Sequence, residues 1–217
     1  MTGPYGDTTR HEREKNMIRI AALACFLFLL GTADRANAAA IVGKPAPSFD
    51  LTDVNGEHVK LASFKGKFVV LEWTNFQCPF VGKHYGSGNM QSLQKQYTEK
   101  GVVWISICSS APGKQGNMTG EEANELIEAK GAAPSRFLLD PKGILGHKYG
   151  AKTTPHMFVI DPKGVLVYNG AIDDKPSTKQ DDVVGAKNYL SAALESAMAG
   201  KKVDVAATQP YGCSVKY

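Results

Sequence analysis

Apolar runs of strand length alternate with helical patterns through the middle of the chain. Residues Phe68–Trp73 and Val102–Cys108 are nearly continuous apolar runs, which is typical of strands buried on both faces. Between them, residues Asn89–Lys100 carry apolar side chains at helical spacing. A helical stretch at Gly120–Lys130 then leads to a third strand at Arg136–Leu139. The pattern predicts an α/β domain with a central sheet.

Two hairpin patterns flank this alternating region. Near the start of the domain, a turn at Asp53–Glu57 separates the extended segment Gly43–Leu51 from the short run His58–Leu61. Later, a Pro-Lys-Gly turn separates the apolar runs His156–Asp161 and Val165–Tyr168. Each pattern predicts two antiparallel strands joined by a turn.

The chain is expected to hold one domain between two terminal extensions. Its 217 residues, of which 43% are hydrophobic and 21% charged, suit a single globular domain. An apolar stripe predicts a closing helix over Thr178–Ala199. We therefore expect the domain at residues 39–199, followed by a flexible tail, residues 200–217, that carries Cys213.

Residues 1–38 have the pattern of a signal peptide. A polar and basic start leads to the apolar run Ile20–Gly31, and Ala36-Asn37-Ala38 offers a small-residue cleavage site. An uncleaved anchor is the weaker alternative, because a membrane-spanning helix needs roughly 20 apolar residues. Translation from Met17 would give a more compact leader. We expect an exported protein, periplasmic or secreted, with no stable membrane insertion after cleavage.

Charge points to no nucleic-acid partner. The formal net charge is +4, and part of it belongs to the lysines and arginines of the leader. The sequence has no dense basic run with interleaved aromatic residues, which nucleic-acid-binding segments usually show.

Three cysteines remain once the leader is removed. Cys25 lies within the leader, whereas Cys78, Cys108 and Cys213 belong to the mature chain. An exported chain reaches a compartment where disulfides persist, but three thiols cannot all pair within one molecule. At least one thiol is therefore expected to stay free or to pair with another molecule.

Cys78 is the strongest candidate for a reactive thiol. It follows a buried strand and precedes Pro79, which fits the first turn of a helix because its missing N–H is not needed there. A cysteine at a helix start faces unpaired backbone N–H groups and the positive end of the helix dipole, and both stabilise the thiolate. The alternative is a small apolar residue that caps a buried strand.

Four segments together resemble the redoxins of the alkyl hydroperoxide reductase and thiol-specific antioxidant group. They are Gly43–Phe49, Trp73–Val81, Thr154-Pro155 and Phe158–Asp161. Over residues 42–198 the resemblance implies a thioredoxin-like fold, in which helices flank a central mixed sheet and a β-hairpin extends the N-terminal side. It also implies a thiol-disulfide oxidoreductase or thiol peroxidase with no cofactor and no metal.

The resemblance assigns a role to Thr154 and Pro155. In such proteins the matching proline is cis and packs against the active-site cysteine, and the preceding backbone offers hydrogen bonds to a bound peptide or thiol. A cis bond is a minority state even before proline, about 5–6% of such bonds, so its expectation here comes from the resemblance. The alternative for Thr154-Pro155 is a plain turn before a strand.

The sequence departs from both branches of this group. Asn75 stands where the thioredoxin branch has the first cysteine of Cys-x-x-Cys, so there is no local dithiol. The peroxidase branch has proline and threonine where this chain has Leu71 and Asn75, and an arginine just before the strand that starts at Met157 here. The nearest arginine is Arg136, one strand earlier. We therefore expect a redoxin with one active-site cysteine, Cys78, and leave the branch open.

A single reactive thiolate needs a second thiol. Attack on a disulfide or a peroxide leaves a mixed disulfide or a sulfenic acid, which another thiol must resolve. Cys213 can reach Cys78, because the dozen or so residues between it and the last helix extend to roughly 40 Å. Cys108 ends a neighbouring strand, but such cysteines are more often buried and inert. We expect Cys213 as the resolver, with Cys108 and an external thiol as alternatives.

Four further side chains are candidates for supporting Cys78. Asn75 can donate its amide hydrogens to the sulfur or to a peroxide oxygen, or serve only as a turn residue. Glu72 is either a buried proton acceptor with a raised pKa or a solvated carboxylate. Lys83 and His84 can stabilise the thiolate electrostatically, although a histidine at such a place is more often on the surface.

Two other functions remain open at this point. Cys78, His84 and His156 are residue types that bind copper, as a copper-delivery redoxin would need, but such a protein is expected to have two cysteines close together. A redoxin that has lost catalysis and only binds a partner would show an ordinary pKa at Cys78. For the redox function we expect a peroxide or a thiol/disulfide protein as substrate and an external thiol as reductant.

Overall fold

The computed structural model describes residues 40–217. The predicted signal peptide, the alternative start at Met17 and Cys25 lie outside the described residues. Within residues 40–217, no helix combines the length and the apolar character that crossing a membrane requires.

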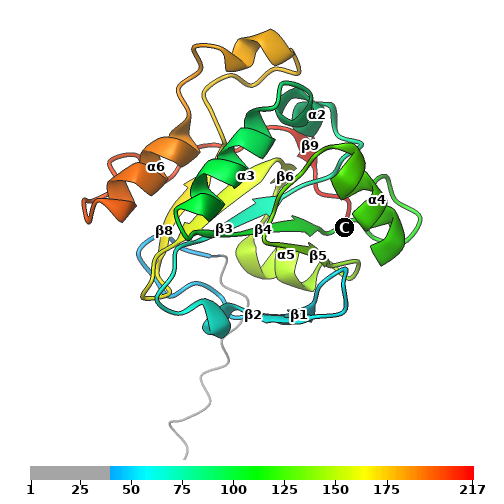
Figure 1. The fold of residues 1–217 in the computed structure, drawn as a ribbon, viewed down its shortest axis with the longest axis horizontal. Helices are drawn as coiled ribbons and strands as arrows, with labels where there is room; N and C mark the ends of the chain where they lie inside the picture. The colour runs from blue at the N-terminus through cyan, green and yellow to red at the C-terminus, as the bar shows by residue number, and fades with distance from the viewer. Residues whose placement is uncertain (1–39) are drawn as a thin grey trace, which may run out of the picture. The chain divides into compact units, whose positions relative to one another are not determined.

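A five-stranded mixed sheet forms the centre of the domain (Figure 1). Its strand order is β5-β4-β3-β7-β8, in which β3 pairs in parallel with β4 and β4 with β5, while β7 pairs antiparallel with both β3 and β8. The strands are β3 (Val69–Trp73), β4 (Val103–Cys108), β5 (Arg136–Leu139), β7 (His156–Ile160) and β8 (Leu166–Gly170). This confirms the predicted α/β fold with a central mixed sheet.

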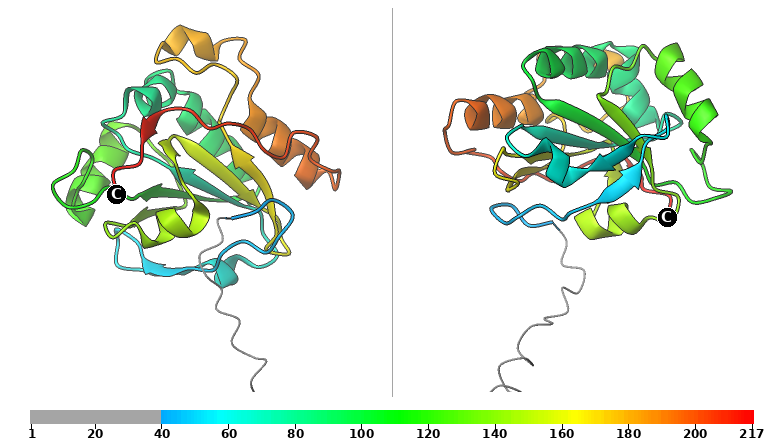
Figure 2. Two further views of the ribbon diagram at one scale, coloured as in Figure 1. Left: turned by 180° about the vertical axis from the view of Figure 1, so that it is seen from behind. Right: turned by 60° about the horizontal axis from the view of Figure 1, so that its bottom comes forward.

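Helices cover one face of this sheet, and a helix with a hairpin covers the other (Figure 2). Because side chains alternate along a strand, Val70 faces the first group and Leu71 faces the second. Every residue of β3 is buried, as its continuous apolar pattern predicted. On the first face lie α2 (Pro79–Gly86), α3 (Asn89–Glu99) and α6 (Tyr189–Met198); on the second lie α5 (Ile144–Tyr149) and the predicted hairpin of β1 (Asp50–Thr52) and β2 (His58–Lys60).

Two further elements complete the domain. Helix α4 (Gly120–Ala129) begins at a capping box, in which Thr119 accepts from the backbone N–H of Glu122 and the Glu122 side chain accepts from that of Thr119. It packs on β5 through Ala123 and Phe137. The short 3-10 helix η1 (Leu61–Phe64) joins β2 to the segment before β3.

The last helix is shorter than the apolar stripe predicted. Residues 178–199 were expected to be one helix, but α6 spans Tyr189–Met198 and a 3-10 helix, η2 (Gln180–Val183), precedes it. Gly185 adopts a φ of 75° between them, which interrupts the helix. Asn188 then caps α6 by accepting a 2.8 Å hydrogen bond from the backbone N–H of Ser191.

Residues 200–217 run along the domain instead of forming the expected loose tail. The strand β9 (Cys213–Ser214) pairs antiparallel with β6 (Thr153–Thr154), and Figure 1 shows the two side by side near α2. Upstream of β9, the backbone N–H of Thr208 donates to the carbonyl of Asn169 at 3.2 Å. The prediction of a flexible tail therefore needs correction, because backbone hydrogen bonds to β8 and to β6 hold the segment against the domain.

Candidate thiol site

Cys78 occupies the N-cap of α2, as the sequence predicted. Its φ and ψ of −84° and 125° are extended, Pro79 follows in the first turn, and the Cys78 carbonyl accepts from the N–H of Gly82 at 2.8 Å. The residue is 1% exposed. The strand β3 thus delivers Cys78 to the start of a helix, where unpaired N–H groups favour a thiolate.

The Thr154-Pro155 segment lies directly against Cys78. Strands β3 and β7 pair so that Trp73 is opposite His156, which brings the residues before β7 to the end of β3. The Thr154–Pro155 peptide bond is cis, as the resemblance implied. The Cys78 thiol donates a 3.1 Å hydrogen bond to the carbonyl of Thr154.

Cys213 reaches the same place through β9. In the β6–β9 pair Cys213 is the partner of Thr154, whose carbonyl already contacts Cys78. Gly212 permits this approach, because its φ is 140° and a Cβ built there would lie 2.0 Å from the Thr154 oxygen. Cys213 packs against the apolar cluster that contains Cys78, and both cysteines are free thiols.

The two thiols have opposite pKa shifts. Burial raises the pKa of Cys78, but hydrogen bonds to its sulfur from the side chains of Cys213 and Thr154, and from the backbone N–H groups of Val81 and Cys213, outweigh burial and lower it overall. The Thr154 hydroxyl is buried and makes no regular hydrogen bond among the described residues, which leaves it free to turn toward this sulfur. Burial and the neighbouring Cys78 raise the pKa of Cys213 to about 11. The lowered pKa favours a thiolate at Cys78, whereas Cys213 stays protonated near neutral pH.

Asn75 shapes the turn before Cys78 and does not donate to its sulfur. The Asn75 Oδ1 accepts from the backbone N–H of Gln77 at 2.9 Å, and its Nδ2 donates to the carbonyl of Gln115 at 3.0 Å. Its own carbonyl accepts from the backbone N–H of Cys78 at 2.9 Å. Gly116, with a φ of 81°, leaves room for the amide, since a Cβ there would lie 2.3 Å from Oδ1. These contacts fit the turn-residue alternative.

Lys83 is buried and forms an ion pair with Asp173. Its ammonium lies 3.2 Å from Asp173 Oδ2, and both side chains are at most 2% exposed. The same Nζ donates to the carbonyl of Lys175 at 2.7 Å and to the hydroxyl of Tyr211 at 3.2 Å. Lys83 thus holds a buried carboxylate and the tail, which sequence reasoning did not anticipate.

His84 is equally buried, contrary to the expectation of a surface histidine. Its Nδ1 accepts from the Asn89 amide at 2.9 Å, so Nε2 carries the proton and donates to the Tyr211 hydroxyl at 3.2 Å. Burial lowers the pKa of His84 to about 4, so the ring is neutral near pH 7. Lys83, His84, Asp173 and Tyr211 form one group, here called the Tyr211 cluster.

Glu72 is a buried carboxylate, but it is bound to other partners. Burial raises its pKa above the usual range. Its oxygens accept hydrogen bonds at 2.8–3.2 Å, and none of these bonds involves Cys78; the donors are Tyr85, Gln94, Trp104 and Ser106. Glu72 therefore joins α2 and α3 to β4.

Cys108 lies in a different cluster from Cys78. It packs with Ala123 and Phe137, and its thiol donates to the carbonyl of Gly116 at 3.3 Å. Burial raises the pKa of Cys108. The structure thus brings Cys213, and not Cys108, to Cys78.

The histidines considered as metal ligands are engaged in other contacts. The Nδ1 of His156 accepts from the backbone N–H of Lys152 at 3.2 Å, and its Nε2 donates to Asn169 Oδ1 at 2.7 Å. His84 is engaged at both ring nitrogens as well. Across residues 40–217, His, Cys, Asp and Glu do not gather in groups of three or more that could hold a metal ion. The geometry gives no support to copper delivery.

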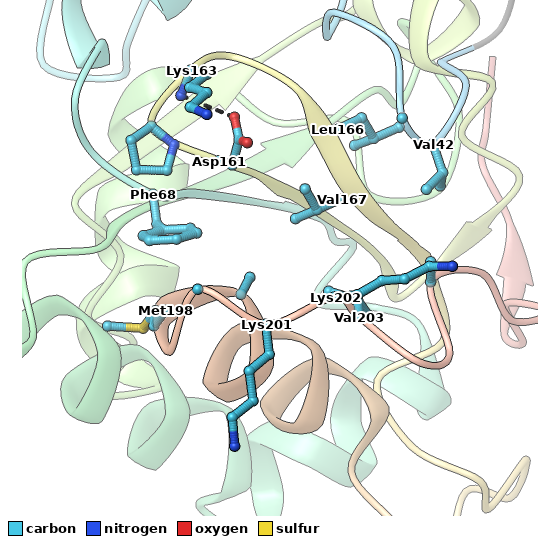
Figure 3. A pocket seen from close by; sticks show the side chains of 15 residues that line it. Val42, Phe68, Asp161, Lys163, Leu166, Val167, Met198, Lys201, Lys202 and Val203 are labelled. Atoms are coloured by element: carbon cyan, nitrogen blue, oxygen red, sulfur yellow. Dashed lines mark hydrogen bonds between the residues drawn. The ribbon is translucent and has the colours of Figure 1, made fainter.

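A pocket of about 560 Å³ lies at the other end of the sheet (Figure 3). Its lining includes Phe68, which precedes β3, Val167 on β8 and Met198 at the end of α6. Cys78 follows the opposite end of β3. The pocket is therefore not part of the thiol site.

Tyr211 and Asp173 are the two site residues that the sequence did not reveal. Tyr211 stands two positions before Cys213, in Pro-Tyr-Gly-Cys, and Asp173 follows β8 by three residues. The available signal was an aromatic hydroxyl and a glycine just before a candidate resolving thiol. The Lys83 side chain that binds both residues, however, is distant from each of them in sequence.

Comparisons with known proteins find similar thiol-dependent redox proteins. Over 115 residues the chain is 30% identical to the thiol-disulfide oxidoreductase ResA of Bacillus thuringiensis subsp. konkukian, a match that spans 47% of this chain and 65% of that protein. Over 137 residues it is 31% identical to peroxiredoxin tpx1 of Schizosaccharomyces pombe, spanning 48% of this chain and 68% of that protein.

The fold has a relative among solved structures. An uncharacterized conserved protein from Geobacillus kaustophilus superimposes with a TM-score of 0.68 and 27% sequence identity, covering 82% of this chain and 92% of the other. A family model described as "AhpC/TSA family" matches residues 42–169. That range holds the sheet, Cys78 and the cis-proline, and with it the chain belongs to the AhpC/TSA family of redoxins.

Proposed function

We propose that the protein is a thiol-dependent oxidoreductase in which Cys78 attacks a peroxide or a disulfide and Cys213 resolves the product. The observation that carries this proposal is the pairing of Cys213 with Thr154, the residue whose carbonyl accepts the Cys78 hydrogen bond. The lowered pKa of Cys78 and the raised pKa of Cys213 support the two different roles.

With a hydroperoxide the proposed reaction has two steps. The Cys78 thiolate attacks one peroxide oxygen, the O–O bond breaks, and an alkoxide or hydroxide leaves and takes a proton from water. The Cys78 sulfenic acid then meets the Cys213 thiol, which displaces hydroxide as water and closes a disulfide. The two sulfurs lose two electrons, and the peroxide gains them.

With a disulfide the same residues suffice. The Cys78 thiolate attacks one sulfur, the other sulfur leaves as a thiolate, and a mixed disulfide forms. Cys213 then gives up its proton and attacks Cys78, which releases the second substrate thiolate. Both routes end in a Cys78–Cys213 disulfide, and we propose that an external thiol reductant reopens it.

The leader supports a place for this reaction outside the cytoplasm. Residues 1–38 have the pattern of a signal peptide, so we propose that the mature protein works in the periplasm or after secretion. The partner-binding alternative, a redoxin without catalysis, is less well supported because the pKa of Cys78 is lowered.

Disulfide mapping tests the proposal. The reduced mature protein is treated with one equivalent of hydrogen peroxide, alkylated and digested, and cysteine pairs are identified by mass spectrometry. We expect a Cys78–Cys213 link, and the same link in a Cys108→Ser control. A product in which Cys78 is joined to Cys108, or in which Cys78 remains a free thiol after peroxide treatment, would contradict the proposal.

A further inference from the structure

The strand that carries Cys213 is held on both sides of the cysteine. Downstream, the backbone N–H of Val215 donates to the carbonyl of Lys152 at 3.1 Å, and the carbonyl of Lys216 accepts from Ala111 at 2.7 Å. The ring of Tyr217 stacks on His147 with centroids 3.9 Å apart. Upstream, the Tyr211 hydroxyl forms hydrogen bonds with Lys83 and Asp173. Figure 2 shows this last part of the chain, in red, lying along the sheet end.

The contacts upstream of Cys213 are the stronger ones, because they involve the buried charges of Lys83 and Asp173. The Tyr211 hydroxyl donates to Asp173 Oδ1 and receives hydrogen bonds from Lys83 and His84. With Tyr211 in place the Lys83–Asp173 pair is at most 2% exposed, so withdrawing Tyr211 would take a hydrogen-bond partner away from two buried charged groups. The ring of Tyr211 also meets Phe80 edge to face at 6.0 Å.

Lys83 links the contacts of Tyr211 to the helix that begins at Cys78. Helix α2 begins just after Cys78 and carries Lys83 and His84 one to two turns later. One end of the helix therefore presents the nucleophilic sulfur, while its buried side binds the tail two residues before the resolving sulfur. Tyr211 thus ties helix α2 to the segment that carries Cys213.

Strand β9 also occupies the edge of β6 at which a segment of another protein would bind. An extended protein segment binds a sheet edge by forming backbone hydrogen bonds with it. At β6 those bonds are made with β9, and Gly212 approaches Thr154 so closely that a Cβ would not fit. Cys78 behind this strand is 1% exposed. A small molecule needs only a local fluctuation to reach the sulfur, whereas a disulfide within a protein needs the strand to leave.

We propose that Tyr211 is a specificity-determining residue, which keeps the Cys213 strand in place and limits the oxidant to a small hydroperoxide in preference to a protein disulfide. This inference rests on the proposed function. Its chemistry is the peroxide route above: the Cys78 thiolate takes one oxygen, the second leaves as water or alcohol, and Cys213 closes the disulfide without leaving its strand.

The test compares two oxidants on wild-type protein and on variants. Loss of free thiol at Cys78 is followed with hydrogen peroxide and with insulin, whose disulfides lie within a protein. Tyr211→Phe removes the hydroxyl and keeps the ring beside Phe80. Gly212→Ala displaces the strand sterically without touching the buried charges. Tyr97→Phe is the matched control, because it also removes a hydroxyl that donates to a carboxylate, at 3.2 Å from Glu195, away from the tail.

We expect wild-type protein and Tyr97→Phe to react with peroxide and hardly at all with insulin. In Tyr211→Phe and Gly212→Ala the ratio of the insulin rate to the peroxide rate should rise by about tenfold or more. A tenfold change corresponds to the free energy that one hydrogen bond to a charged group contributes. Circular dichroism checks that each variant is folded. A raised ratio in either folded variant supports the inference.

Two kinds of result would overturn the inference, and only the second would also contradict the proposed function. If wild-type Cys78 reacts with insulin as fast as with peroxide, or if the ratio is unchanged in both folded variants, the specificity role of Tyr211 fails while the proposed function stands. If Cys78 reacts with neither oxidant in any of the proteins, the proposed function fails as well.

Discussion

Cys213 lies opposite Thr154 in the β6–β9 pair, and the Thr154 carbonyl accepts the hydrogen bond of the Cys78 thiol. Thr154 thus contacts the Cys78 sulfur through its carbonyl and pairs with Cys213 in the strand register. Because Pro155 has no backbone N–H, the pairing ends there, and Cys213 is left beside the cysteine at the end of β3.

The first prediction concerns the pH dependence of alkylation. Iodoacetamide reacts with thiolates, so the rate at each cysteine rises with pH and levels off above its pKa. Cys78 should level off below the range of an ordinary cysteine, and Cys213 well above it, because their pKa values are shifted in opposite directions. Peptide mass spectrometry after timed alkylation measures both rates in one sample.

A Cys213→Ala variant tests the cause of the first shift. Removing the Cys213 thiol takes away a hydrogen bond to the Cys78 sulfur, so the pH midpoint for alkylation of Cys78 should rise. The Cys108→Ala variant is the control, because Cys108 packs in another cluster and should leave that midpoint unchanged. Equal midpoints in wild-type protein and Cys213→Ala would contradict this account.

The second prediction separates attack from resolution. A Cys213→Ser variant should consume one equivalent of hydrogen peroxide and stop, with sulfenic acid accumulating on Cys78, because no other thiol of residues 40–217 packs in its cluster. A dimedone adduct detected by mass spectrometry identifies that state. Cys108→Ser should turn over like the wild-type protein when an excess of a thiol reductant is present. Sustained wild-type turnover by Cys213→Ser would instead show that an outside thiol resolves Cys78.

The central sheet was predictable because its signals are local. Continuous apolar runs predicted β3, β4 and β5 to within about one residue, since a strand buried on both faces has few polar positions. Helix α5 was missed. Its six residues, Ile144–Tyr149, lie between Gly143 and Gly150, and so short a stretch has too few turns to show a periodic pattern.

The site was predictable only in part. Cys78 was recognised because a strand, a cysteine and a proline follow one another in the sequence. The hydrogen bond between Lys83 and Tyr211, in contrast, joins residues 128 positions apart. Polar residues between α6 and Cys213 read as a loose segment, because nothing local indicates that their backbone groups pair with β6 and β8. A buried lysine likewise has no mark in the sequence, since its burial depends on a carboxylate brought to it by the fold.

The third prediction concerns export. If the leader is processed at Ala36-Asn37-Ala38, the mature protein should begin at or near Ala39. N-terminal sequencing of protein recovered from the periplasm or the medium measures this directly. A variant with Ala36→Lys and Ala38→Lys should retain the leader, because the processing site needs small residues. An intact leader on wild-type protein from that compartment would reject cleavage.

The last prediction concerns the buried ion pair that anchors the tail. Lys83→Ala leaves Asp173 charged in a site at most 2% exposed, so the free energy of unfolding should fall by about 3–5 kcal/mol, the usual cost of removing one partner of a buried pair. Lys100→Ala is the matched control. It breaks the Lys100–Glu195 pair, whose side chains are 41% and 53% exposed, and should change stability by less than about 1 kcal/mol. Urea unfolding followed by tryptophan fluorescence measures both. Replacing both buried partners, with Lys83→Met and Asp173→Leu, should restore part of the loss because no isolated charge remains. Equal effects of Lys83→Ala and Lys100→Ala would mean that the buried pair contributes no more than a surface one.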